Sequence, residues 1–384
     1  MSLKNNNSIS GIIFIFFFVL QQIIALLFMS YNYYKLYSYV IVMVTILIGL
    51  KQPLLKKEYQ YPFIFMLVCV IGSFMTLFNG SSLGSCIFKS LYAFIGYIGF
   101  VYISENRINL RLFNFLFIIL YIFYYSSYFM FDEFTRKILD GDLFGTSSSN
   151  TIAISLNIML FFYFILKRSY KESNYKVVTF IAIINLVLII IQGSRAGIVV
   201  AFILLLLCLS ELFNFKKVYF PLILFSIISL VVINNNYDKL LEIMDLDRMQ
   251  GLKSIEEDVR GVAQRSFFYN LNFANFFLGY PSGTEFTFEI TRTFNAFIDF
   301  WNRFGFIPFL SLIIFLLRRI FNYKRFDLSL LFFTPLIIYS LVESLWGGNS
   351  WDILIYFLLF YSYKSNEFDI RHISYLKRNH SMIK

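Results

Sequence analysis

Long apolar blocks alternate with short polar segments along most of this chain. Twelve blocks can be placed, at 11–29, 36–50, 61–78, 87–104, 112–131, 151–166, 177–191, 197–213, 218–233, 298–317, 327–345 and 352–363. About 20 apolar residues in a helix cross a hydrocarbon core of about 30 Å. A segment in lipid must satisfy its own backbone hydrogen bonds, which a helix does internally. The pattern therefore predicts an all-α polytopic membrane protein with about twelve transmembrane helices.

The first block has a cleaved signal peptide as its alternative interpretation, because Lys4 precedes it as a thin basic region. A signal peptide needs small residues at its cleavage site. The residues after this block, Met29–Ser30–Tyr31–Asn32–Tyr33, are mostly bulky. We therefore predict an uncleaved first span.

Basic residues set the orientation of the spans, because loops on the cytoplasmic side carry an excess of Lys and Arg. With the N-terminus inside, the inner segments hold Lys51, Lys56, Lys57, Arg107, Arg111, Lys167, Arg168, Lys171, Lys176, Lys216, Lys217, Arg318, Arg319, Lys324 and Arg325. The short outer segments near 30–35, 79–86, 192–196 and 346–351 hold only Lys35 and Arg195. This alternation needs an even number of spans and predicts that both termini are cytoplasmic.

The composition agrees with a membrane protein and narrows its chemistry. Hydrophobic residues make up 58% of the chain and charged residues 15%. The basic inner segments account for the net charge of +10, so nucleic-acid binding is not needed to explain it. The cysteines Cys69, Cys86 and Cys208 have no zinc or disulfide spacing, so we expect small buried side chains. Both histidines, His372 and His380, lie in the C-terminal tail, and no glycine-rich nucleotide loop is evident. We expect no metal and no cofactor.

Two outer segments are long. One runs over 132–150, and the larger runs over 234–297 between spans nine and ten. We interpret residues 1–384 as one integral membrane domain with the 234–297 loop inserted in it. Apolar and charged residues over 238–249 are spaced as in an amphipathic helix. Such a helix would lie on the membrane surface or cover a cavity below it. A second helical stretch over 265–277 ends at a Gly- and Pro-containing turn at 279–283.

A candidate phosphate site lies in the turn Gln192–Gly197 between two apolar blocks. Ser194 is placed to cap the next helix, whose free N–H groups and positive dipole end would face outward. Arg195 beside such a helix end suits a phosphate group. The alternative is that Arg195 extends to lipid headgroups from a tight turn.

The large loop adds three arginines and a polar helix face. Arg260, Arg265 and Arg292 stand among a larger number of acids, so the alternative to anion binding is local pairing with those acids. Asn295, Asp299 and Arg303 recur every four residues and would share one helix face. Their alternative interpretation is an Asp299–Arg303 ion pair at the membrane interface.

Together, these motifs resemble the O-antigen polymerase and O-antigen ligase superfamily of bacterial envelopes. The resemblance is carried by Ser194–Arg195–Ala196–Gly197, Arg265, Gly279 and Gly283, Phe294–Asn295–Ala296–Phe297–Ile298–Asp299, Arg303–Phe304–Gly305–Phe306–Ile307 and Gly145–Thr146–Ser147–Ser148–Ser149–Asn150. One position departs from the family, because its histidine is Phe294 here. Ligases are thought to use that histidine, so the departure favours a polymerase.

The resemblance implies a multi-pass protein of the bacterial inner membrane with undecaprenyl-pyrophosphate-linked oligosaccharides as donor and acceptor. The reaction would be glycosyl transfer on the periplasmic face, with a pyrophosphate leaving group and no nucleotide or metal. We expect Arg195 and Arg265 to hold the pyrophosphate and Asp299 to position or deprotonate the acceptor. Further expected binding residues are Arg260, Arg292, Asn295 and Ser194.

Two alternatives remain open at this point, an O-antigen ligase and a flippase or transporter of the same lipid-linked unit. A chain-length regulator and a flippase are the protein partners that the resemblance implies. The repeat-unit sugars, the linkage, the kind of surface glycan and the oligomeric state do not follow from the sequence.

Overall fold

The structure is a computed structural model, and its described part is helical. It describes residues 12–13, 44, 47, 52–106, 108–130, 149–170, 174–192, 195–213, 259–281, 283–286, 295–321, 335–337, 339–341 and 352–360, with no strand among them. Two helical stretches are long and apolar enough to cross a membrane, Lys57–Asn79 and Leu83–Glu105. They coincide with the expected spans 61–78 and 87–104. The expected spans 11–29, 36–50, 218–233 and 327–345 and the amphipathic stretch 238–249 lie wholly or largely outside the described residues.

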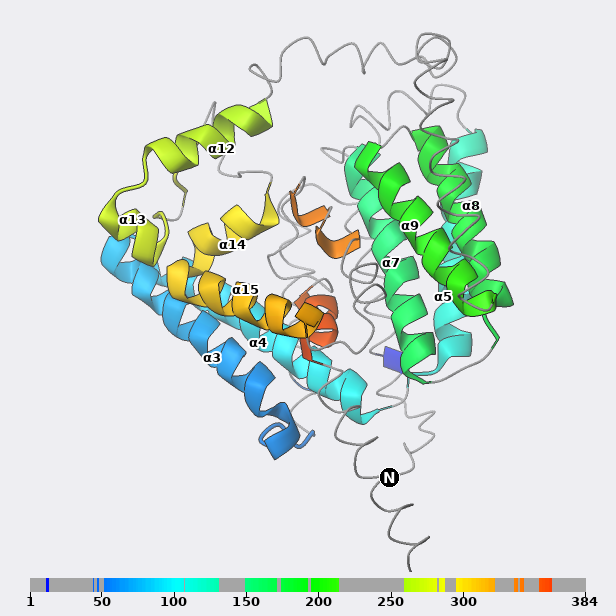
Figure 1. Cartoon of the computed structure of the whole chain (residues 1–384), viewed down its shortest axis with the longest axis horizontal. Coiled ribbons are helices and arrows are strands. Elements are labelled where there is room, and N and C mark those ends of the chain that lie inside the picture. Colours follow the sequence, from blue (N-terminus) through cyan, green and yellow to red (C-terminus); the bar gives the residue numbers. More distant parts are fainter. Residues whose placement is uncertain are drawn as a thin grey trace, which may run out of the picture.

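The described helices form two groups (Figure 1). The first group contains η1 (Lys57–Tyr59), α3 (Gln60–Met75), η2 (Thr76–Asn79), α4 (Leu83–Glu105), α12 (Val259–Tyr269), α13 (Phe273–Leu278), α14 (Ala296–Phe304) and α15 (Phe306–Phe321). The second contains α5 (Leu110–Met130), α7 (Ser149–Ser169), α8 (Lys176–Gln192) and α9 (Arg195–Leu212). Each helix of the second group covers most of one expected span.

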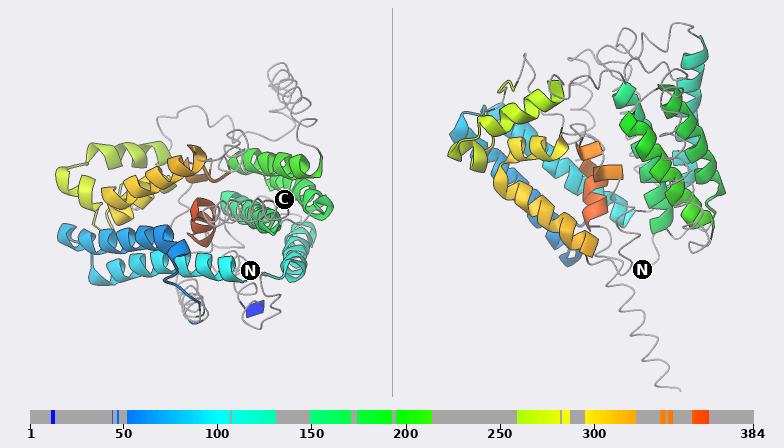
Figure 2. Two further views of the ribbon diagram at one scale, coloured as in Figure 1. Left: turned by 60° about the horizontal axis from the view of Figure 1, so that its bottom comes forward. Right: turned by 45° about the horizontal axis from the view of Figure 1, so that its top comes forward.

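Helical residues 352–360 lie between the two groups, as both views in Figure 2 show. All nine are buried. Glycines on α4 allow the close approach: a Cβ at Gly96 would lie 2.8 Å from the Tyr356 ring, and one at Gly99 would lie 2.5 Å from the Ile353 side chain. Small residues let membrane helices pack this closely. The predicted last span is therefore enclosed by protein.

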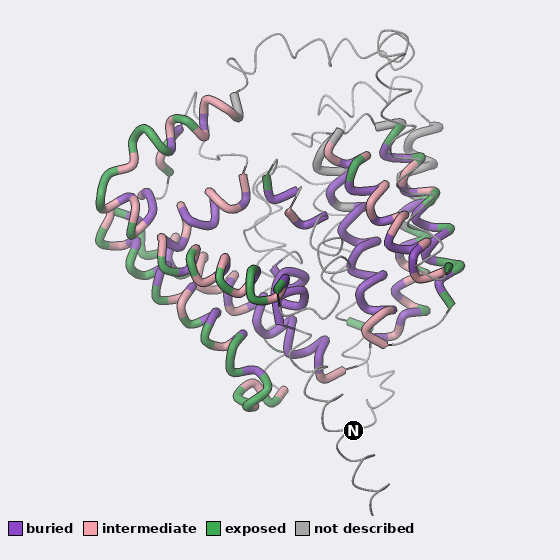
Figure 3. Tube along the Cα trace, viewed as in Figure 1, coloured by how far each residue is buried: buried purple, intermediate pink, exposed green. Residues whose placement is uncertain are grey.

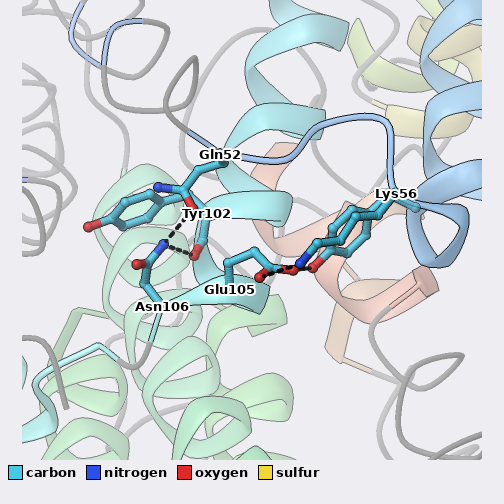
Figure 4. A network of polar contacts seen from close by, with 6 residues as sticks. Gln52, Lys56, Tyr102, Glu105 and Asn106 are labelled. Carbon is cyan, nitrogen blue, oxygen red and sulfur yellow. Dashed lines mark hydrogen bonds and ion pairs between the residues drawn. The ribbon is translucent and has the colours of Figure 1, made fainter. Parts of the chain in front are cut away.

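The start of α3 is tied to the end of α4 (Figure 4). Lys56 Nζ lies 2.9 Å from Glu105 Oε2, and the Tyr59 hydroxyl donates a hydrogen bond to the same carboxylate. Asn106 Nδ2 donates to Gln52 Oε1 at 3.2 Å. The two helices are therefore an antiparallel pair with Lys56 at one end.

Further contacts bring other basic helix ends to the same side. The backbone N–H of Ile108, between α4 and α5, donates to the Tyr170 hydroxyl after α7 at 2.9 Å. Arg168 near the end of α7 pairs with Glu211 at the end of α9 at 2.5 Å. The expected inner segments around 51–57, 105–111, 167–176 and 211–217 thus meet where the structure describes them. The assignment of this side to the cytoplasm stays a prediction from the positive-inside rule.

Two expected helices differ in the structure. The predicted span 298–317 is divided at Gly305, which has φ +84° and lies between α14 and α15. A Cβ there would lie 2.5 Å from the Phe277 carbonyl oxygen, so the close approach and the left-handed backbone both require glycine. The expected helix over 265–277 is likewise divided into α12 and α13, because the Asn272 side chain caps a new helix by accepting from Asn275 N–H at 2.7 Å.

Candidate functional site

The part of the large loop that the structure describes folds onto α14. We call residues 259–281, 283–286 and 295–304 the loop unit. Its core consists of Ala263, Phe267, Tyr280, Phe286 and Trp301, all buried. The two hydrogen-bond donors of this core both have acceptors. Trp301 Nε1 donates to the Phe276 carbonyl at 2.7 Å, and the Tyr280 hydroxyl donates to the Phe267 carbonyl at 2.5 Å. The described part of the loop is therefore an ordered aromatic unit.

Tyr280 keeps its proton in this setting. Burial raises the pKa of its hydroxyl above the ordinary value. The hydroxyl therefore remains a hydrogen-bond donor to the Phe267 carbonyl at neutral pH, and the residue serves packing of the loop unit.

The loop unit is fixed to the far end of α3. Asn79 Nδ2, at the end of η2, donates to Asn275 Oδ1 at 2.8 Å and to the Gly279 carbonyl at 2.5 Å. Gly72 lies directly against the α14–α15 junction, where an added Cβ would overlap the Phe304 carbonyl oxygen and the Pro308 ring. These contacts fix the position of the loop unit relative to the C-terminal end of α3.

Asp299 lies in the first turn of α14 and is 2% exposed. Asn295 begins this helix, since its side-chain oxygen accepts from the N–H groups of Phe297 and Ile298 at 3.0 and 3.2 Å. That oxygen caps the helix, which gives Asn295 a structural task that the sequence interpretation had not assigned. Arg303 lies in the last turn of α14. Among the described residues, ion pairs join Lys56 to Glu105 and Arg168 to Glu211, and an Asp299–Arg303 pair is not present.

Lys89 on α4 and Arg303 on α14 are both half-buried cations. A partly buried cation loses some of its hydration, and a bound anion offsets that loss. Arg303, on the helix that carries Asp299, is therefore a candidate for binding a phosphate group.

Two charged residues within the predicted spans, Lys89 and Asp352, are not among the site residues predicted from the sequence. Asp352 is buried, and its Cβ would lie 3.3 Å from a Cβ at Gly96. An ionisable residue inside an expected span is a functional candidate in its own right, and this rule could have identified both.

The predicted pyrophosphate arginines lie on different helix groups. Helix α9 of the second group begins at Arg195, as expected, and Arg265 lies exposed on α12 of the first group (Figure 1). The side chains of Arg195 and Arg260 lie outside the described residues, as do Ser194 and Arg292. The predicted roles of these residues remain predictions.

A buried amide network fixes the beginning of α9. Asn157 Nδ2 on α7 donates to the Gly197 carbonyl at 2.9 Å, two residues after Arg195. Asn185 Nδ2 on α8 donates to Asn157 Oδ1 at 2.6 Å, and the Tyr121 hydroxyl on α5 donates to Asn185 Oδ1 at 2.5 Å. Asn157 also bonds to the hydroxyl of Tyr339. This network joins every helix of the second group at the level of the Arg195 turn.

Asn157→Ala is expected to destabilise the protein by about 1–2 kcal/mol, because interhelical hydrogen bonds in membranes have about this value. The substitution removes a partner from Asn185 and from the Gly197 carbonyl. The measurement is the thermal midpoint of the purified protein in detergent. Asn270→Ala, which removes an exposed amide, is the control and should leave the midpoint unchanged. Equal midpoints for both variants would contradict the role of the network.

The residues that the structure describes contain no group of three His, Cys, Asp or Glu side chains arranged to hold a metal ion. The chain matches no protein-family model, no curated protein and no solved structure.

Proposed function

We propose that this chain is a membrane glycosyltransferase that polymerises undecaprenyl-pyrophosphate-linked repeat units into a surface polysaccharide. It would do so on the periplasmic face of the bacterial inner membrane, with twelve spans and both termini in the cytoplasm. The observation that carries the proposal is a buried carboxylate, Asp299, on a helix whose last turn carries Arg303. A carboxylate can accept the proton of the attacking hydroxyl, and a cation can stabilise the leaving pyrophosphate.

The proposed reaction uses these groups in one displacement. An acceptor hydroxyl attacks the anomeric carbon of the donor sugar and forms the new glycosidic bond. Its proton passes to the Asp299 carboxylate, and the bond from the anomeric carbon to the pyrophosphate oxygen breaks. The electron pair leaves with undecaprenyl pyrophosphate. A positioned base contributes about 10²- to 10⁴-fold to such a reaction.

The cations stabilise the charge that develops on the leaving group. Arg303 on α14 is the candidate that the structure adds, and Arg265 and Arg195 are the sequence candidates. Planar guanidinium groups suit phosphate oxygens because they donate two parallel hydrogen bonds. A clamp that used both Arg265 and Arg195 would hold the pyrophosphate between the two helix groups. Arg260, Arg292, Ser194 and Asn295 are further proposed binding residues.

The test of the function is the surface-glycan ladder of a strain that lacks this protein, beside the complemented strain. A polymerase predicts that the ladder collapses to a core with a single repeat unit. Loss of all repeats with long lipid-linked chains retained would identify a ligase. Loss of all repeats with intermediates held on the inner face would identify a flippase, and an unchanged ladder would refute all three functions.

Arg195 provides a more local prediction. Arg195→Ala should reduce polymerisation about 100-fold, because removal of one donor to a developing anion has about this effect. Arg195→Lys should also be impaired, by about tenfold, because an ammonium keeps the charge but loses the bidentate geometry. The measurement is ladder length and rate in the complemented strain. Arg111→Ala, at an exposed position on the opposite side, is the control, and near-normal polymerisation with Arg195→Ala would exclude the clamp.

A further inference from the structure

Helices α3 and α15 each expose an apolar stripe along one face. On α3 and η2 the stripe contains Ile64, Leu67, Ile71, Met75 and Phe78, and Tyr61 and Phe74 are exposed beside it. On α15 they are Ile307, Leu310, Ile314, Leu317 and Phe321. Both series repeat every three or four residues, which is the spacing of a single helix face. Each stripe runs the length of its helix.

The two stripes belong to neighbouring antiparallel helices. Tyr61 at the start of α3 contacts Phe315 near the end of α15, with ring centroids 6.4 Å apart. At the other end, Gly72 lies against Pro308. Figure 3 shows exposed positions along both helices and on α12 and α13 above them. An apolar surface of this length, on a helix long enough to cross a membrane, fits lipid acyl chains.

Aromatic side chains lie where the stripe of α3 ends. Phe78 on η2 and Phe273 on α13 are each 81% exposed, and Tyr269 at the end of α12 is 91% exposed. Phe277 on α13 is partly exposed and contacts the Phe306 ring of α15 at a centroid distance of 6.1 Å. We call these four residues the aromatic rim. The Asn79 hydrogen bonds to Asn275 and Gly279 hold α13, and with it the rim, at the level of η2.

The length of the helical stretch Lys57–Asn79 sets the depth of the aromatic rim in the bilayer. Lys57–Asn79 comprises 23 residues, which at 1.5 Å per residue gives roughly 34 Å. This is close to a hydrocarbon thickness of about 30 Å. With the basic residues Lys56 and Lys57 at one surface of the bilayer, Asn79 and the rim reach the other surface. Tyr is enriched at that boundary because its ring is apolar and its hydroxyl is polar, and Phe contributes to the apolar face of helices that lie in the interface.

We propose that the aromatic rim inserts into the headgroup region of the bilayer and anchors the loop unit to the lipid surface. The occupant of this exposed surface is lipid, because the rim continues the exposed stripe of a membrane-spanning helix. The rim rings enter the interface, and Asp299 and Arg303 on α14 lie within the unit that they anchor. The inference depends on the membrane assignment and is independent of the glycosyl-transfer chemistry.

The test attaches a nitroxide spin label to single cysteines in the full-length protein in phospholipid vesicles. Phe273→Cys reports on the rim, Ile71→Cys reports on the bilayer core, and Glu285→Cys reports on an exposed acid of the loop unit. The native cysteines are buried, and labelling of the wild type measures their background. Collisions with oxygen report lipid, and collisions with a water-soluble nickel complex report water.

The expected ratio of oxygen to nickel collisions is highest at position 71, intermediate at 273 and lowest at 285. A ratio at 273 equal to that at 285 would overturn the proposal, because the rim would then be in water. A label at 273 that is shielded from both reagents would also overturn it, because a protein surface would then cover the rim. An aqueous ratio at position 71 would instead refute the membrane assignment of α3.

Discussion

Asp299→Asn is expected to reduce the rate of polymerisation about 100-fold or more, the range in which a positioned base contributes. The amide has nearly the size of the carboxylate, so the buried position should keep its packing. It cannot accept the proton of the acceptor hydroxyl. The loss should therefore fall on kcat and leave KM for the lipid-linked donor nearly unchanged. The measurement is conversion of purified lipid-linked repeat units by the protein in vesicles.

The control for this substitution is Glu285→Gln, which neutralises an exposed acid in the same loop unit. Its rate should equal that of the wild type. The thermal midpoint of Asp299→Asn should also match the wild type, which separates a chemical defect from a folding defect. Full activity of Asp299→Asn would exclude the proposed base and leave the cationic residues without their catalytic partner.

Gly279→Ala is expected to disrupt the loop unit, at a cost of about 2–5 kcal/mol from left-handed backbone and overpacking together. Gly279 has φ +78°, and an added Cβ would overlap the backbone carbonyl oxygen of Asn302. A backbone atom cannot move aside as a flexible side chain can. The same residue accepts the hydrogen bond from Asn79 that joins the unit to η2. Limited proteolysis should cleave the variant within 259–286 at protease concentrations that leave the wild type intact.

Gly283→Ala is the matched control, because Gly283 has φ +88° but open space where the Cβ would be. Its cost should be limited to the left-handed backbone, about 1–2 kcal/mol. The comparison therefore isolates the close approach to Asn302. Equal protease sensitivity of the two variants would show that the Asn302 contact does not hold the unit.

Helices α3, α4, α7, α8 and α9 could be predicted from the sequence to within a few residues. Their apolar length is a local property, and a hydrocarbon core leaves few alternatives to a helix. The break at Gly305 could not be predicted in the same way, because the apolar run continues through Phe304 and Phe306 on both sides. Gly305 adopts its backbone conformation beside the Phe277 carbonyl, which comes from a distant part of the chain.

The candidate site was predictable only in part, for the same reason. The spacing of Asp299 and Arg303 correctly placed them on one helix, but the burial of Asp299 depends on how the loop unit folds against α14. Asn157 and Asn185 are the only amide side chains within their apolar blocks, and their pairing requires α7 and α8 to be packed side by side.

The buried helix at 352–360 has a consequence for the order in which this protein assembles. Chains emerge from the ribosome N-terminus first, and every other described helix is made before this one. Its contacts with Gly96 and Gly99 on α4, and between Phe357 and Phe162 on α7, bridge the two groups. Helices α3 and α4 are made first, the second group follows, α12–α15 come next, and the packing that joins the two groups through this helix forms late in synthesis. A nascent chain arrested before residue 352 would lack the helix that joins the two groups. The surface of α4 that carries Gly96 and Gly99 would then be exposed to the membrane quality-control machinery.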